Sequence, residues 1–167
     1  MRGVVFAILI QMDDLRIRRA NTSDAATIAA FNAAMARETE HLELDPVRLL
    51  AGVEAVLADE AKGFYVVAES GAGRVVGQLM ITFEWSDWRN GVFWWIQSVY
   101  VDRPVRGTGV YKRLYEHIRS AATAAGNVCG LRLYVERDNS RAQEVYRRQG
   151  MQATAYQMFE VDFVIGR

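Results

Sequence analysis

The chain has 167 residues, of which 51% are hydrophobic and 24% charged, and these values are ordinary for a globular protein with one domain. Lysine plus arginine number 20 and aspartate plus glutamate number 20, so the formal net charge of zero argues against a protein that mainly coats nucleic acid. The single cysteine, Cys129, excludes an intramolecular disulfide. The two histidines offer no ordinary spacing of zinc ligands, so we expect no metal site.

A short apolar run, Val4 to Ile10, lies near the N-terminus. It is shorter than the ~20 apolar residues of a membrane helix, and no small-residue cleavage site of a secretory signal follows it. Three interpretations stay open: an extra strand, a flexible leader, or a start codon chosen upstream of Met12. We expect an extension over residues 1–11 and one folded domain over residues 12–167, in the cytoplasm and without a membrane partner.

The first part of that domain reads as a strand followed by two helices. Residues 15–19 alternate apolar and basic side chains, as a strand does. Residues 22–24, Thr-Ser-Asp, supply N-cap chemistry for a helix that runs to about Glu40. Asp45-Pro46 begins a second helix, because proline suits the first helical turn, and this helix ends before Gly63.

Three strands follow these helices. Residues 64–69 form the first strand, and the turn at residues 70–73, Ser-Gly-Ala-Gly, leads into the second at residues 75–85, so the two make a hairpin. After a further turn at residues 86–91, residues 92–101 form a third strand that is rich in β-branched and aromatic side chains.

The last part alternates helix and strand. A helix begins at Val110 and stops at Gly126, and residues 131–135 form a short strand. Residues 138–150 form another helix, opened by Asp-Asn-Ser and closed by glycine, and the pattern of residues 151–164 predicts one or two closing strands. The resulting order is β-α-α-β-β-β-α-β-α-β, which is a mixed α/β sheet in a single domain.

The turn Arg-Gly-Thr-Gly connects the third of these strands to the helix at Val110. Gly107 and Gly109 have no Cβ, so the backbone can bend sharply and approach a ligand closely. The first N–H groups of the helix have no partner within it and lie at the positive end of its dipole. This arrangement predicts a cradle for a diphosphate. It is not a P-loop, since no Gly-Lys-Ser/Thr follows, nor a dinucleotide fingerprint, since Lys112 stands where the third glycine belongs.

The same segment resembles motif A of the GNAT N-acetyltransferase superfamily. In that motif a strand ending in apolar-x-Val meets a short acidic-proline loop and then Arg/Gln-x-x-Gly-x-Gly/Ala. The matching residues here are Val99-Tyr100-Val101 for the strand end, Asp102-Arg103-Pro104-Val105 for the loop, and Arg106-Gly107-Thr108-Gly109-Val110-Tyr111 for the glycine turn. Tyr111 departs from the small residue that is usual at the last position.

A second segment resembles motif B of the same superfamily. The strand at residues 131–135 is followed by Asn139, by Tyr146 on a helix, and by Gly150-Met151 at its end. The resemblance extends over about residues 15–163, although only the two motifs are specific. Without it, the simpler interpretation is that Asn139 caps a helix and that Tyr146 fills the core.

The resemblance implies an activity. It predicts a GNAT-like fold with two splayed central strands that grip the pantetheine arm of acetyl-CoA, the co-substrate. The acetyl group would pass to a primary amine of a small molecule or peptide by direct attack in a ternary complex, with no nucleic acid involved. A non-catalytic acyl-CoA-binding sensor or interaction module is the alternative. A homodimer through residues 158–165 is left open.

The resemblance also implies roles for single residues. Tyr146 would protonate the departing thiolate, and the diphosphate would lie on the glycine turn beside Arg106. The predicted acetyl-CoA-binding residues are Val99, Tyr100, Val101, Arg106, Gly107, Thr108, Gly109, Val110, Tyr111 and Asn139. Relatives often carry a glutamate in the strand before the turn, but this chain has Gln97 nearby. The general base therefore stays open among Glu38, Glu40, Glu84, Asp87, Glu136 and a water on Gln97, with Glu84 as the working choice.

Overall fold

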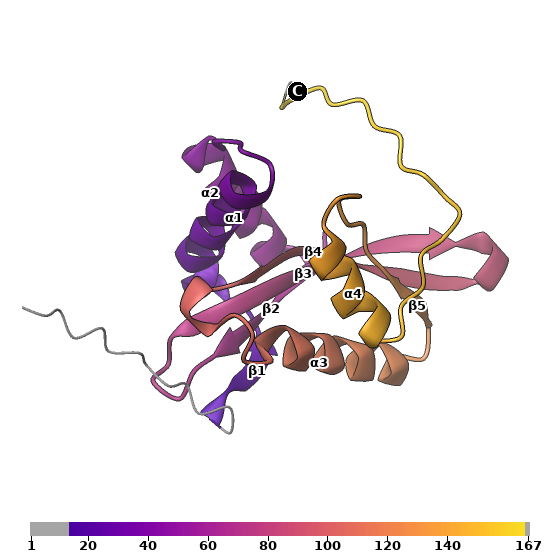
Figure 1. Ribbon diagram of the computed structural model, residues 1–167, viewed down its shortest axis with the longest axis horizontal. Helices are drawn as coiled ribbons and strands as arrows, with labels where there is room; N and C mark the ends of the chain where they lie inside the picture. The colour runs from indigo at the N-terminus through magenta and orange to yellow at the C-terminus, as the bar shows by residue number, and fades with distance from the viewer. Residues whose placement is uncertain (1–13, 166–167) are drawn as a thin grey trace, which may run out of the picture. The chain divides into compact units, whose positions relative to one another are not determined.

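The computed structural model describes residues 14–165, and the extension predicted for residues 1–11 lies outside them. The chain divides into two compact units, one that ends at Tyr134 and one that begins at Val135 (Figure 1). Within the described residues, none of the helices has both the length and the apolar character needed to cross a bilayer.

The first unit contains a five-stranded sheet in the order β1-β2-β3-β4-β5. The first four strands are antiparallel neighbours, whereas β5 runs parallel to β4. Their bounds are β1 Arg16–Arg19, β2 Phe64–Glu69, β3 Val75–Ser86, β4 Gly91–Val101 and β5 Val128–Arg132. The mixed α/β fold class predicted from the sequence is confirmed.

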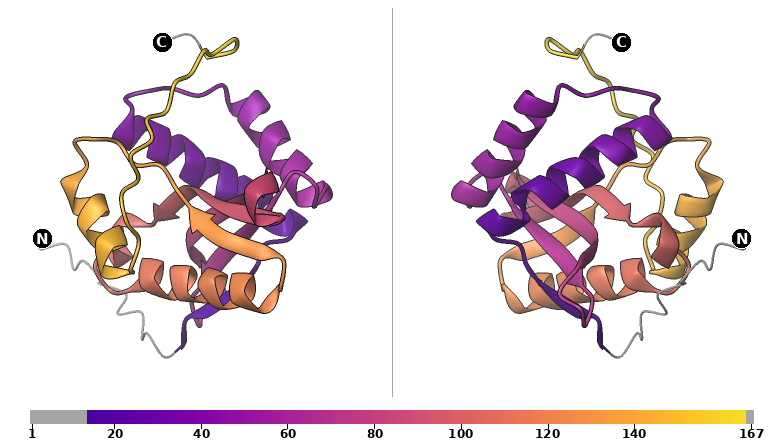
Figure 2. Two further views of the ribbon diagram at one scale, coloured as in Figure 1. Left: turned by 90° about the vertical axis from the view of Figure 1, so that its right-hand side faces the viewer. Right: turned by 90° about the vertical axis from the view of Figure 1, so that its left-hand side faces the viewer.

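Helices cover both faces of this sheet (Figure 2). Helices α1 (Ala25–Thr39) and α2 (Pro46–Ala58) pack on the face that carries Tyr65 and Val67. Neighbouring strand residues point to opposite faces, so Gly77, which pairs with Ala68, points to the other face. Helix α3 (Val110–Ala124) covers that face so closely that a Cβ on Gly77 would lie 2.9 Å from Val110 Cγ1. This contact fixes the start of α3 against the sheet.

The helix starts follow the chemistry expected of them, with one shift. The Asp45 carboxylate accepts from Arg48 N–H at 2.8 Å and Pro46 occupies the first turn, as predicted. The residue that caps the turn before α1 is Asn21, one place before the predicted group, and it forms a capping box with Asp24. These caps stabilise helices whose apolar sides then complete the core.

A β-bulge interrupts the pairing of β4 with β3. Gln78 pairs with Tyr100 but Met80 pairs with Gln97, so β4 has one residue more than β3 across this interval. The extra residue is at Ser98, whose φ of 49° is in the left-handed region. The bulge changes which residues of β4 direct their N–H and C=O groups toward β3.

The two central strands separate just before this bulge. The pairing of β4 with β5 ends at Trp95 and Arg132, while β4 continues to Val101. Over residues 14–134, residues 96–101 therefore have a strand neighbour on the β3 side alone. The predicted splay is present. The position predicted for the fifth strand, residues 131–135, is wrong, because pairing with β4 draws Val128–Arg132 into the sheet instead.

The second unit contains one helix, α4 (Ser140–Arg148). Gly150, at φ 85°, ends it, with Met151 N–H donating to Tyr146 O at 3.1 Å. The closing strands predicted within residues 151–164 are absent from this unit as far as residue 165. The apolar alternation is there, but a strand also needs a paired neighbour and this unit supplies none.

Candidate active site

The glycine turn joins β4 to α3 by way of a short 3-10 turn, η4 (Arg103–Val105). Gly107 and Gly109 have φ values of 83° and 96°, in the region that favours glycine. Gly109 is also the N-cap of α3, where no side chain caps the first N–H groups. Thr108 closes the turn: its hydroxyl donates to Val105 O at 2.7 Å, and its N–H makes a long bond of 3.4 Å to the same oxygen.

Backbone direction along β4 explains why Val99 and Val101 face the open edge. Before the bulge, Val92 N–H donates toward β5, to Asn127 O at 2.9 Å. After it, Asp102 N–H donates to Val76 O on β3 at 2.9 Å. Because alternate residues of a strand point to opposite edges, the backbone groups of Val99 and Val101 face the side that β5 has left. Without the bulge, the residues that alternate with Val99 and Val101 would face that open side instead.

Arg106 lies across this open edge. Its Nε donates to the carbonyl oxygen of Val101 at 2.8 Å, one of the groups predicted to bind the pantetheine arm. Its guanidinium carbon is 5.1 Å from the ring centroid of Tyr100. The carbonyl of Val101 therefore already has one donor, and a ligand amide would have to share or replace it.

Glu38, from the last turn of α1, connects that helix to the glycine turn. Its carboxylate accepts from Arg106 Nη2 at 2.8 Å, Arg103 Nε at 2.9 Å and Tyr100 OH at 3.1 Å. Burial raises the pKa of Glu38, but the hydrogen bonds from Arg106, Arg103 and Tyr100 outweigh burial, so the pKa lies below its ordinary value. Glu38 was a candidate base in the sequence. Its contact with the arginines of the turn was not predicted, because no local spacing reports it.

Glu84 lies on β3, beside the last pair of β4 and β5. It accepts hydrogen bonds from the indole N–H of Trp95 and from Arg132 Nη1, the latter at 2.6 Å. The bond from Trp95, helped by Arg132, lowers the pKa of Glu84 below its ordinary value. Trp95 precedes Val99 by four strand residues, roughly 13 Å. The structure thus groups Val99 with the glycine turn, and it holds Glu84 apart from them.

Two buried amides near the bulge did not figure among the predicted site residues. Gln78 is 0% exposed and Asn32 6% exposed, although both stand in apolar surroundings. Gln78 Nε2 donates to Asn32 Oδ1 at 2.7 Å. A lone glutamine within the apolar run of β3 was a readable signal, since buried amides are uncommon without a partner.

The second unit holds the remaining two predicted residues. Asn139 caps α4, with its Oδ1 accepting from Ala142 N–H at 3.0 Å, and its predicted contact with acetyl-CoA stays a prediction. Tyr146 is half-buried, and burial raises the pKa of its phenol above the ordinary value of 10.0. A phenol with a raised pKa stays protonated at neutral pH, as a proton donor must.

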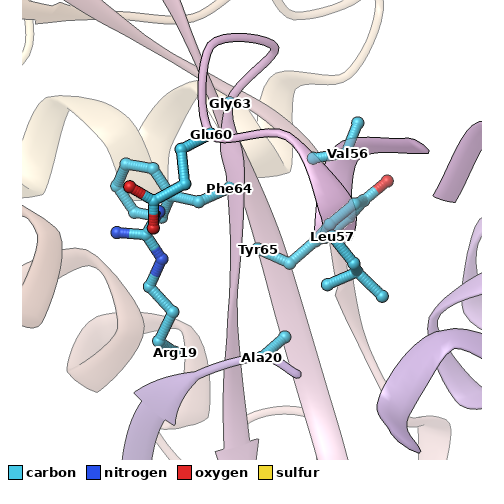
Figure 3. Close-up of a pocket in the computed structure, with 8 residues that line it drawn as sticks. All are labelled: Arg19, Ala20, Val56, Leu57, Glu60, Gly63, Phe64 and Tyr65. Atoms are coloured by element: carbon cyan, nitrogen blue, oxygen red, sulfur yellow. The ribbon is translucent and has the colours of Figure 1, made fainter. Parts of the chain in front are cut away.

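A separate hollow lies between α2 and the β1–β2 pair and contains none of the predicted site residues (Figure 3). Arg19 and Glu60 form an ion pair of 3.0 Å at its rim, and the Arg19 guanidinium carbon is 4.0 Å from the ring centroid of Phe64. The two opposite charges are thus paired with each other at the rim of the hollow.

Comparison with known proteins agrees with the family resemblance found in the sequence. A model of the acetyltransferase (GNAT) family matches residues 27–151. No curated protein matches the chain. The solved structure of a possible acetyltransferase from Clostridium difficile 630 has 44% sequence identity to this chain and a TM-score of 0.84, covering 90% of this chain and 99% of that chain.

More distant structures share the fold. A predicted acetyltransferase with acetyl-CoA from Clostridium acetobutylicum has 18% identity and a TM-score of 0.72, covering 89% of this chain and 96% of that chain. A ribosomal-protein-alanine N-acetyltransferase from Brucella melitensis biovar Abortus 2308 has 19% identity and a TM-score of 0.71, covering 90% and 99%. At these identities the likeness extends to the fold alone.

Proposed function

The chain belongs to the acetyltransferase (GNAT) family, and from this premise we propose that it transfers an acetyl group from acetyl-CoA to a primary amine of a small molecule or peptide. Acetyl-CoA is the co-substrate of this family. The observation that carries the proposal is the open edge of β4, which leads directly into a glycine turn and an uncapped helix start.

The open edge suits the arm of acetyl-CoA. Backbone groups of Val99 and Val101 would pair with the pantetheine amides as a neighbouring strand does. The diphosphate would lie on backbone N–H groups at the start of α3, where the helix dipole favours an anion. The residues assigned to this binding are Val99, Tyr100, Val101, Arg106, Gly107, Thr108, Gly109, Val110, Tyr111 and Asn139.

The reaction would proceed by direct attack. The neutral amine nitrogen bonds to the thioester carbon, and the negative charge that develops on the oxygen is stabilised by Val99 N–H. When the tetrahedral intermediate collapses, the C–S bond breaks and Tyr146 gives its phenolic proton to the thiolate. The ammonium proton leaves to a base. We assign Glu84 to this last role. Because Glu84 lies apart from Val99, a chain of water molecules would carry the proton to its carboxylate, which the lowered pKa keeps ionised at neutral pH.

The acceptor amine, the cytoplasmic location and a homodimer formed through residues 158–165 remain predictions. The predicted homodimer has one structural feature in its favour. Large apolar side chains of the second unit are exposed, among them Phe159, Val161 and Phe163. Exposed apolar groups of this size commonly mark contacts with another molecule.

The direct test is release of the CoA thiol from acetyl-CoA in the presence of a panel of primary amines. The proposal expects amine-dependent release with at least one member, accompanied by the acetylated amine in a mass spectrum. Binding of CoA by calorimetry without transfer to any amine would identify a non-catalytic acyl-CoA sensor instead. Absence of CoA binding at millimolar concentration would rule out both the acetyltransferase and the sensor function.

A further inference from the structure

The conformation of Ser98 requires support. A serine with φ of 49° is in a region that residues with a Cβ seldom adopt, and the bulge at this position sets the direction of the next N–H group, that of Val99. In the proposed function, Val99 N–H stabilises the charge on the thioester oxygen. Any group that fixes the backbone conformation of Ser98 therefore also fixes the direction of the Val99 N–H.

Buried polar side chains from three elements converge on Ser98. Gln78 Nε2 on β3 donates to Asn32 Oδ1 on α1 at 2.7 Å and lies 3.5 Å from the carbonyl oxygen of Ser98. Asn32 Nδ2 donates to the Tyr65 hydroxyl on β2 at 3.2 Å. Burial raises the pKa of Tyr65, while hydrogen bonds with Asn32 and with the Ser98 side chain oppose this. Ser98 is thus contacted at its carbonyl oxygen by Gln78, and the chain of hydrogen bonds continues from Gln78 to Asn32 and Tyr65.

Burial of these polar side chains costs desolvation free energy on folding. Gln78, Tyr65 and Asn32 are 0%, 3% and 6% exposed, and Gln78 Oε1 has no hydrogen-bond partner within residues 14–165. Apolar residues of similar volume would avoid the desolvation of two amides and a phenol. A role in folding alone does not explain why two amides and a phenol are buried together next to the bulge.

We propose that Gln78, Asn32 and Tyr65 are positioning residues, whose buried hydrogen bonds hold Ser98 in its left-handed conformation and so aim Val99 N–H at the reacting thioester. The inference rests on the proposed function and adds to it three residues that touch neither substrate. It also links α1 to the geometry of β4.

The test replaces Gln78 with methionine, which has a similar length and no amide. Gln78→Met should lower kcat at least about tenfold, because a misdirected oxyanion donor resembles a missing one, while the Kd for CoA changes by less than about threefold. Glycine adopts a positive φ without strain, so Gln78→Met/Ser98→Gly should recover most of the lost kcat. Ser86→Ala, which removes another buried polar group of β3, is the matched control and should keep wild-type kcat.

A second variant covers the case in which Gln78→Met does not fold. Ser98→Thr keeps the hydroxyl but adds a branched Cβ that resists positive φ, so kcat should again fall while the Kd for CoA is kept. Unchanged kcat in both variants overturns the inference. A parallel loss of kcat and CoA binding, or no recovery with Ser98→Gly, assigns the network to folding only and also overturns it. A wild-type protein that acetylates no amine overturns the proposed function, and this inference with it.

Discussion

The guanidinium of Arg106 binds two groups that bear on the coenzyme. It donates to the carbonyl of Val101, on the edge proposed for the pantetheine arm, and it pairs with the carboxylate of Glu38. A carboxylate and a phosphate are alternative partners for arginine. Glu38 therefore occupies Arg106 and Arg103 with an anion of the protein's own, and in the proposed function the diphosphate of acetyl-CoA would compete with it.

Removal of the Glu38 charge should consequently favour the coenzyme. We expect Glu38→Gln to lower the Kd for CoA about threefold to tenfold, roughly 1 kcal/mol, and to steepen its dependence on salt. Calorimetry at two ionic strengths measures both. Glu43→Gln, which removes a more exposed partner of Arg37 at 3.5 Å, is the control and should leave the Kd unchanged. Weaker binding in Glu38→Gln would show instead that Glu38 prepares Arg106 for the ligand.

Tyr146 offers a second test at the scale of one residue. Tyr146→Phe removes the proposed acid, so kcat should fall about 100-fold or more, with the Kd for CoA within about twofold of wild type. Since burial raises the phenol pKa above 10.0, the acid form is present at neutral pH and is lost only as the pH rises through that higher value. Steady-state rates from about pH 6 to about pH 9 should show no fall due to Tyr146. Tyr156→Phe, at an exposed position, serves as control. Equal losses in kcat and CoA affinity would contradict the acid role.

Among the elements, the link between β4 and α3 is the one whose geometry the sequence specified most directly. Gly107 and Gly109 predicted a sharply bent backbone, and the structure gives both residues a positive φ. The helix of residues 110–124 followed from its apolar periodicity and the stop at Gly126. In each case the information is local, because conformational preference and spacing act within a few residues.

Other features depended on pairing between distant segments and were not predicted. The bulge at Ser98 arises from the register of β4 against β3, which no local pattern encodes. The fifth strand lies three residues earlier than predicted, because its register with Val92 to Trp95 determines its position. The contact of Glu38 with Arg106 brings together residues far apart in sequence. Residues 151–164 have strand-like alternation, yet alternation without a partner does not make a strand.

The glycine turn can be tested against a matched turn elsewhere in the same unit. Gly107 and Gly73 have φ values of 83° and 75°, and a Cβ at either would meet nothing within 4 Å. Alanine at either position should therefore cost a similar amount, roughly 1–2 kcal/mol, from backbone strain alone. Only Gly107→Ala should raise the Kd for CoA, by about fivefold or more, as seen by calorimetry. Equal Kd values for CoA in the two variants would show that the glycine turn does not bind the diphosphate.

At the scale of the whole molecule, a part-buried cluster of ion pairs contributes to the response to acid. Arg18, whose side chain is 18% exposed, donates to Asp24 at 2.8 Å and to Glu69 at 2.7 Å, joining β1, the start of α1 and β2. The hydrogen bond from Arg18 is the main reason that the pKa of Asp24 lies below the ordinary 3.8. A lowered folded-state pKa gives stability that is complete above the unfolded-state value and is lost as the pH falls through the folded-state value.

We therefore expect Asp24→Asn to lower the free energy of unfolding by about 1–3 kcal/mol at pH 7. The difference from wild type should begin to narrow below about pH 4, where Asp24 of the unfolded chain takes up a proton, and should narrow further as the pH falls through the lowered folded-state pKa. Urea unfolding followed by circular dichroism at pH 7 and pH 3 measures this change. Glu60→Gln, in an exposed pair with Arg19, is the control and should change the free energy of unfolding by less than about 1 kcal/mol at both pH values. An equal difference in the free energy of unfolding at both pH values would show that the ion pair does not cause the loss of stability.

The open edge of β4 has a consequence for how this scaffold diversifies. If main-chain atoms grip the coenzyme, exposed side chains that contact neither the bulge nor the glycine turn can be exchanged without loss of that grip. Selection, natural or in the laboratory, is then free to remodel exposed positions of α1 and α2 for a new acceptor while acetyl-CoA binding is kept. Libraries that randomise those exposed positions, and spare Asn32, Glu38 and residues 98–109, should retarget the enzyme with few inactive clones.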